Sequence, residues 1–150
     1  MNTVTSPVQA MQKRMAFHGA LMLWISMIHG LYLVGVMTHL VPGNEAMTLG
    51  AHVNGLMGAF WLLGMGWSLR FVQLSERLLG IAVWMTLTGA WFNFLLAMIK
   101  AVQGAMAIEF TGDAFNDIVF AARVLLVVIP SLVGPALWVW GMRTRSSSGT

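Results

Sequence analysis

The sequence has no cysteine, little charge and only one tyrosine. Without cysteine, the chain can form no disulfide, no thiolate metal site and no cysteine nucleophile. Charged residues make up only 9% of the 150 residues, whereas an ordinary soluble domain has about 25%. Eight basic and five acidic side chains are too few to cover a soluble protein in which 58% of the residues are hydrophobic. The composition therefore excludes a soluble globule and predicts that lipid covers part of the chain.

Long apolar runs are what the sequence has in abundance. About 20 apolar residues suffice to cross a membrane as a helix, and four runs reach that length, the last interrupted only by Arg123. We therefore predict an all-α fold, an integral membrane four-helix bundle. It forms a single domain over residues 1–150 and ends in a disordered tail at residues 144–150. The predicted helices cover about residues 15–41, 46–69, 78–99 and 118–142.

The basic residues are concentrated at one end of the predicted helices. By the positive-inside rule, this distribution places both termini in the cytoplasm and predicts a multi-pass protein of the bacterial inner (cytoplasmic) membrane. The sequence pI of about 10.2 then reflects topology, and no nucleic-acid partner is expected. The basic residues assigned to the cytoplasmic side are Lys13, Arg14, Arg70, Arg77, Arg143 and Arg145, which leaves Lys100 and Arg123 on the other side.

Three histidines lie on the first predicted helix. Ionisable side chains at membrane depth are costly and usually face a bundle interior or a cavity. His18, about one turn into the helix, is expected to extend to the cytoplasmic interface, and His39 is expected at the outer interface. His29 lies near mid-membrane, where a neutral imidazole bonded to a backbone carbonyl and a place in the substrate pocket remain equally open.

The fourth histidine, His52, belongs to a group of polar residues at one depth. It lies about 10 Å below the outer surface, next to Asn54, and Asn93 on the third helix lies at about 9 Å. Buried amides need partners in hydrocarbon, so we expect these groups to line one pocket, with Asn54 and Asn93 as catalytic residues. Trp91, two residues before Asn93, is the predicted aromatic wall of that pocket.

Small residues and one cation complete the predicted site. Ala51, Gly55 and Ala59 recur every four residues, which suits either close helix packing or the approach of a planar ligand. Arg123 belongs to the same outer layer. An ion pair with a nearby acid is its expected arrangement, and an anionic group of a ligand is the alternative. The acids within reach of Arg123 are Glu109, Asp113 and Asp117.

Residues 14–21, 47–57 and 89–93 resemble the bacterial hydroxylaminobenzene mutases and the related styrene oxide isomerases. The most specific element is the Ala-His-x-x-Gly-x-Met run that starts at Ala51. Both families are small integral membrane isomerases of aromatic compound degradation. The resemblance implies a homo-oligomer, a trimer by analogy, that binds haem b through His52, with the iron as a Lewis acid. Gly55 and Arg123 are the further cofactor contacts that we predict.

Departures from the family patterns leave the substrate open. The mutases have Glu where this chain has Asn54, and both families have Asn where it has Gly58. We therefore predict an isomerase of a small aromatic substrate, which converts either an arylhydroxylamine to an aminophenol or an aryl epoxide to an aldehyde by Meinwald rearrangement. The alternative is a haem b-binding electron-transfer or sensor subunit, in which His52 pairs with His39 or with a histidine of another subunit.

The topology can be tested with reporter fusions. A reporter fused after Thr150 should be active in the cytoplasm, and one inserted between Lys100 and Asp117 should be active on the opposite side of the membrane. A C-terminus outside the cytoplasm would show that one of the predicted helices does not cross the membrane.

Overall fold

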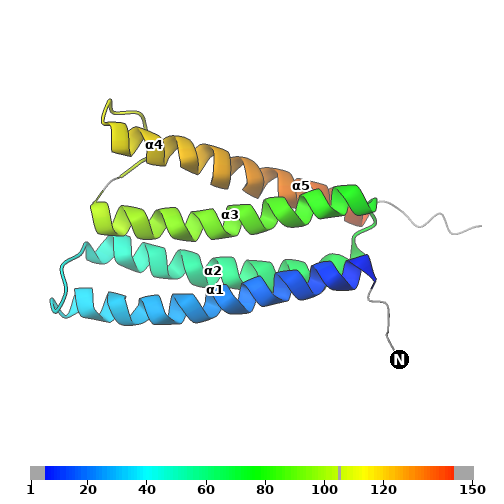
Figure 1. Ribbon diagram of the computed structural model, residues 1–150, viewed down its shortest axis with the longest axis horizontal. Helices are drawn as coiled ribbons and strands as arrows, with labels where there is room; N and C mark the ends of the chain where they lie inside the picture. Colours follow the sequence, from blue (N-terminus) through cyan, green and yellow to red (C-terminus); the bar gives the residue numbers. More distant parts are fainter. Residues whose placement is uncertain (1–5, 105, 144–150) are drawn as a thin grey trace, which may run out of the picture.

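The computed structural model describes residues 6–104 and 106–143, and these residues form four antiparallel helical rods (Figure 1). All four rods are long and apolar enough to span a membrane. The predicted all-α four-helix fold is therefore confirmed, and the chain is a multi-pass membrane protein. The predicted tail, residues 144–150, lies outside the described residues. The elements are α1 (Pro7–Met37), α2 (Glu45–Ser68), the 3-10 turn η1 (Leu69–Phe71), α3 (Glu76–Gln103), α4 (Ala114–Arg123), the π-helix η2 (Val124–Val128) and α5 (Ile129–Arg143).

The helices begin earlier than the apolar runs that predicted them. Helix α1 starts at Pro7 because the Ser6 hydroxyl accepts a hydrogen bond from the Gln9 backbone N–H, while the Gln9 side chain caps the Ser6 N–H in return. In the same way, Asp113 caps the start of α4 through the backbone N–H of Asn116. Polar caps set these boundaries, whereas hydropathy detects only the part of a helix within hydrocarbon.

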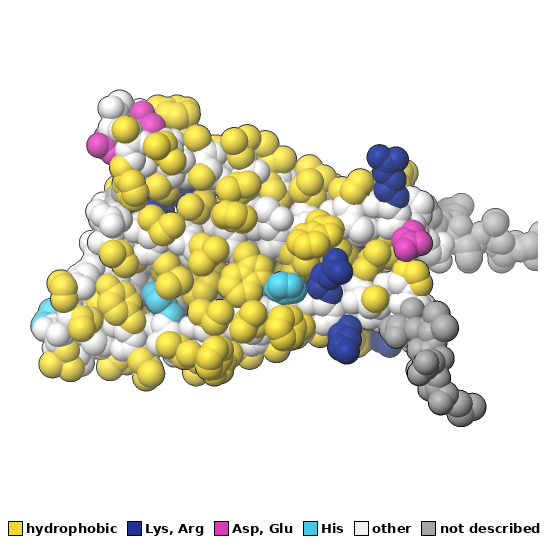
Figure 2. Space-filling model, viewed as in Figure 1, with side chains coloured by type: hydrophobic (Ala, Val, Ile, Leu, Met, Phe, Trp, Pro, Cys, Tyr) yellow, Lys and Arg dark blue, Asp and Glu magenta, His cyan; other side chains and the backbone are white. Residues whose placement is uncertain are grey.

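The rods pack in sequence order rather than as a closed square (Figure 1). Helix α2 packs between α1 and α3, and α5 packs against α3. Both the first turn of α1 and the last turn of α5 lie at the same end of the molecule. Figure 2 shows hydrophobic side chains over the middle of the visible face and most Lys and Arg side chains near that end.

Glycines bring neighbouring helices into close contact. A Cβ on Gly55 of α2 would overlap the Ser26 hydroxyl of α1 and would lie 2.8 Å from the Phe94 ring of α3. Between α3 and α5, a Cβ on Gly134 would lie 2.7 Å from the Thr86 hydroxyl. Small-residue contacts of this kind let membrane helices approach backbone to backbone. They hold α1, α2, α3 and α5 at fixed distances around the polar groups described below.

The last rod changes its hydrogen-bond pattern before Pro130. The Ile129 backbone N–H bonds to the Val124 carbonyl, five residues earlier, which defines the π-helical segment. Proline has no N–H, and its ring clashes with the carbonyl four residues earlier in an α-helix. The wider turn accommodates Pro130, and such π segments are frequent at functional sites.

The close contact at Gly55 predicts a large effect of a small substitution. Gly55→Ala should lower the free energy of unfolding by about 1 to 3 kcal/mol, because the added methyl group overpacks the α1–α2–α3 interface. Gly64→Ala on the same helix is the matched control, since nothing lies within 4 Å of its Cβ position. Reversible unfolding in mixed micelles, followed by circular dichroism, measures both. Equal stability of the two variants would contradict this packing.

Candidate functional site

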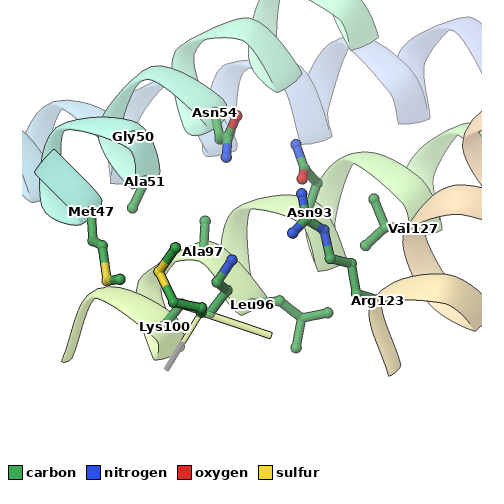
Figure 3. Close-up of a pocket in the computed structure, with 11 residues that line it drawn as sticks. Met47, Gly50, Ala51, Asn54, Asn93, Leu96, Ala97, Lys100, Arg123 and Val127 are labelled. Carbon is green, nitrogen blue, oxygen red and sulfur yellow. The ribbon is translucent and has the colours of Figure 1, made fainter. Parts of the chain in front are cut away.

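A cavity of about 220 Å³ lies between α2, α3 and the start of the last rod (Figure 3). Two amides, Asn54 and Asn93, and two cations, Lys100 and Arg123, supply its polar groups. All four side chains are half-buried. The remaining lining residues are small or apolar: Met47, Gly50, Ala51, Leu96, Ala97, Met106 and Val127.

Helical spacing explains why these residues meet. Asn93 and Lys100 are seven residues apart on α3, so they lie two turns apart on nearly the same face. On α2, Ala51 and Asn54 are three residues apart and also face the cavity. Arg123 ends α4 directly before the π-helix. The last rod packs against α3. The cavity lies where the start of this rod is separated from α2.

The expected ion pair of Arg123 does not form within the described residues, where the one ion pair joins His39 to Glu45. Asp113 and Asp117 bond to the backbone of the loop and of α4 instead, and Glu109 is exposed. The Asp117 carboxylate accepts hydrogen bonds from the backbone N–H groups of Thr111 and Gly112, at 2.8 and 3.1 Å. Lys100 and Arg123 therefore face the cavity without an ion-pair partner among residues 6–104 and 106–143.

His52 does not line this cavity, although it shares its depth. Its Nδ1 lies 3.0 Å from the Ser26 carbonyl oxygen of α1. A carbonyl can only accept, so Nδ1 carries the proton and the Nε2 lone pair is left free. The ring rests against Gly30, where a Cβ would lie 3.0 Å from Cε1. The expectation that His52, Asn54 and Asn93 line one pocket is therefore wrong for His52, which lies on another flank of α2.

His29 is almost fully buried, at 6% exposure, beside His52. The two rings are nearly parallel, with centroids 6.2 Å apart. Its Nδ1 has no hydrogen-bond partner among the described residues, so no backbone carbonyl satisfies that atom. With Tyr32 and Met98, His29 lines a separate apolar hollow of about 340 Å³ between α1 and α3.

Trp91 does not line the Asn54 cavity and instead bonds to His18. The Trp91 Nε1–H donates to His18 Nδ1 at 3.2 Å, across the contact between α1 and α3. The predicted place of Trp91 in the wall of the Asn54 cavity is therefore not the one observed. The His39 side chain is 83% exposed and lies beside Glu45, in the connection after α1.

Gly55 is occupied by helix packing, and its predicted contact with a cofactor finds no space in the structure. The position of its missing Cβ is filled by Ser26 and Phe94. Sequence reasoning missed three residues: Ser26 and Gly30, which position His52, and Lys100, which it had assigned to a loop. The seven-residue spacing from Asn93 was the available signal for Lys100.

The surroundings of His52 can be compared with what a haem iron requires. In the part of the chain that the structure describes, no group of three or more His, Asp or Glu side chains could chelate a metal ion. A haem iron is held by its macrocycle and needs only one protein ligand. His52 fits that requirement, because ligating histidines typically donate their other N–H to a carbonyl.

The bond between Trp91 and His18 can be measured by a double-mutant cycle. Trp91→Phe and His18→Ala should each lower the free energy of unfolding, and their coupling energy should be about 0.5 to 1.5 kcal/mol. Unfolding of the four proteins in detergent gives this energy. Additive effects would show that the bond contributes nothing.

One comparison with known proteins identifies a family. No curated protein sequence and no solved structure matches the chain. Residues 11–143, which include most of the first rod, the other three rods and every polar residue of the cavity, match the family model of styrene oxide isomerase. The resemblance predicted from the sequence is thereby confirmed. The chain belongs to the styrene oxide isomerase family and is an isomerase.

Proposed function

We propose that this protein isomerises a small aromatic oxygen compound inside the bacterial inner membrane, with haem b bound to His52. The reaction is either the Meinwald rearrangement of an aryl epoxide to an aldehyde or the conversion of an arylhydroxylamine to an aminophenol. Family membership supports the isomerase class. The apolar surface of the four rods supports a substrate that reaches the protein from the bilayer.

The observation that carries this proposal is the hydrogen bond from His52 Nδ1 to the Ser26 carbonyl. It fixes the tautomer and directs the free lone pair to Nε2, as a sole axial ligand requires. Gly30 leaves the space for the ring to lie against α1. Bound there, haem b would supply a ferric Lewis acid for the oxygen of the substrate.

The cavity lined by Asn54 and Asn93 would bind and orient the substrate. A dry apolar cavity of about 150 Å³ can hold benzene. The space of about 220 Å³ in this protein therefore suits an aromatic ring with a short substituent. The amide N–H groups of Asn54 and Asn93 would hydrogen-bond the substrate oxygen, an interaction that is stronger in a dry site than in water. The apolar part of the wall would limit the access of water, which would otherwise hydrolyse an opened epoxide.

The position of His52 outside the cavity has a consequence for the oligomeric state of the protein. The ring contacts α1, whereas Asn54 faces α3 and the last rod. A substrate in the cavity of one copy cannot contact His52 of the same copy across α2. Our proposal therefore includes a homo-oligomer, a trimer by family resemblance, in which the His52 flank of one subunit adjoins the cavity of the next.

If haem binds to His52, substitutions of His52 and of Gly30, which contact each other, should affect haem binding to different extents. His52→Ala should lose haem and activity together, because the sole protein bond to the iron is removed. Gly30→Ala should weaken haem binding by about 10- to 100-fold, because its methyl group displaces the His52 ring from its carbonyl partner. Haem titration monitored by visible absorbance measures both, with Gly64→Ala as the control. If His52→Ala kept a normal haem spectrum and His29→Ala lost it, the haem ligand would be His29 on α1 and the assignment to His52 would be wrong.

The assigned role of the amides predicts a variant that keeps haem. Asn93→Leu should leave the haem spectrum unchanged and slow turnover by about 10²- to 10³-fold, the usual cost of one lost hydrogen-bond donor to a developing negative charge. Purified protein should be assayed with styrene oxide and phenylhydroxylamine in parallel. A low-spin bis-histidine spectrum without product from either compound would support an electron-transfer or sensor subunit instead.

A further inference from the structure

Two cations in the cavity are unexplained by the substrates proposed above. Aryl epoxides and arylhydroxylamines are neutral, and the two asparagine amides already offer them hydrogen bonds. Lys100 and Arg123 nevertheless direct their charged groups into the same space (Figure 3). A positive charge within a membrane-spanning rod is costly, and such residues usually face a cavity and pair with another charge.

No acidic side chain of the same copy supplies that charge. Neither cation takes part in an ion pair within residues 6–104 and 106–143, and these ranges contain all five acidic residues. Each acid is placed elsewhere: Glu45 beside His39, Glu76 exposed in the first turn of α3, Glu109 exposed in the loop before α4, Asp113 at the cap of α4, and Asp117 bonded to the loop backbone. Within one copy of the chain, the anion that would compensate the two cations is therefore left to a ligand.

We propose that the substrate of this isomerase carries a carboxylate on its aromatic ring and that Lys100 and Arg123 bind this carboxylate. The inference rests on the proposed function and narrows its substrate class. Arginine presents a planar fork of donors that matches a carboxylate, and lysine adds a compact charge with three donors. The two residues come from different rods, so an anion between them would also hold the last rod against α3.

The position of Lys100 fits an amphiphilic ligand. It lies three residues before the end of α3 at Gln103, next to the loop that leads to α4. A charged substituent would stay near this polar end of the bundle, while the ring would lie against Leu96, Ala97 and Val127. The carboxylate is unchanged by the isomerisation. It contributes binding energy and orients the reacting oxygen toward Asn54 and Asn93.

Kinetics with a matched pair of epoxides test this proposal. The haem-loaded protein should convert para-carboxystyrene oxide with a kcat/KM about 10- to 100-fold above that for styrene oxide, the effect expected of a charge-assisted contact. Lys100→Gln and Arg123→Gln should each abolish this preference, mainly through KM, and Lys100→Arg should retain part of it. Lys13→Gln, at an exposed position on α1, is the control for the loss of one cation. An unchanged preference in both glutamine variants would overturn the proposal.

Equilibrium binding provides a readout that does not depend on catalysis. Calorimetry in neutral detergent should show that para-ethylbenzoate binds about 10- to 100-fold more tightly than the isosteric para-ethylbenzamide, and that Lys100→Gln removes the difference. Equal binding of the two compounds would overturn the proposal. If phosphatidylglycerol in nanodiscs, and not the benzoate, bound in a Lys100-dependent manner, the anion would be a lipid phosphate and the substrate assignment would be wrong.

The two proposals fail in different ways. If styrene oxide were converted without any preference for the carboxylated epoxide, the isomerase function would stand and the charged substrate would be excluded. If the benzoate bound in a Lys100-dependent manner but no epoxide or hydroxylamine were converted, the anion site would stand and the proposed reaction would be wrong.

Discussion

The close approach of α1 and α2 is the contact on which the other features depend. Gly55 admits the Ser26 hydroxyl, and Gly30 admits the His52 ring, so each helix has a glycine where the other brings a polar group. Near the start of α1, the Gln12 side chain donates to the Gly66 carbonyl at 3.3 Å. In hydrocarbon there is little hydrophobic force between helices, so packing and hydrogen bonds of this kind must hold them together.

The way in which the last rod packs against α3 determines where the cavity lies. Gly134 faces the Thr86 hydroxyl of α3, and the Trp138 indole N–H donates to the Ser68 hydroxyl at 3.1 Å. These contacts fix the C-terminal half of α5 against α3 and the end of α2. Toward the other end, the space beside α2 is lined by two amides and two cations instead. The protein therefore combines a tightly packed end with an end that is open to a ligand.

Hydropathy was sufficient to predict the four helices, because the membrane imposes a minimum apolar length. Depth along a helix placed Asn54 and Asn93 at one level, and the structure brings both into one cavity. Depth says nothing about direction around a helix. His52 and Asn54 are two residues apart, which separates them by about 200° around the axis, so they face different neighbours. The hydrogen bond of His52 is made to a backbone carbonyl, which every residue has, so the sequence could not predict it and the structure was needed to find it.

The π-helix gives the last rod a property that its composition does not show. A turn closed by a bond over five residues holds one residue more than an α-turn, so it shifts the register of everything that follows. Arg123 lies before this shift, and Trp138 lies after it. In a regular α-helix the two side chains would be rotated relative to each other by about 100° from their present arrangement. One additional residue in a turn thus allows a single rod to direct a cation into the cavity and an indole toward α2.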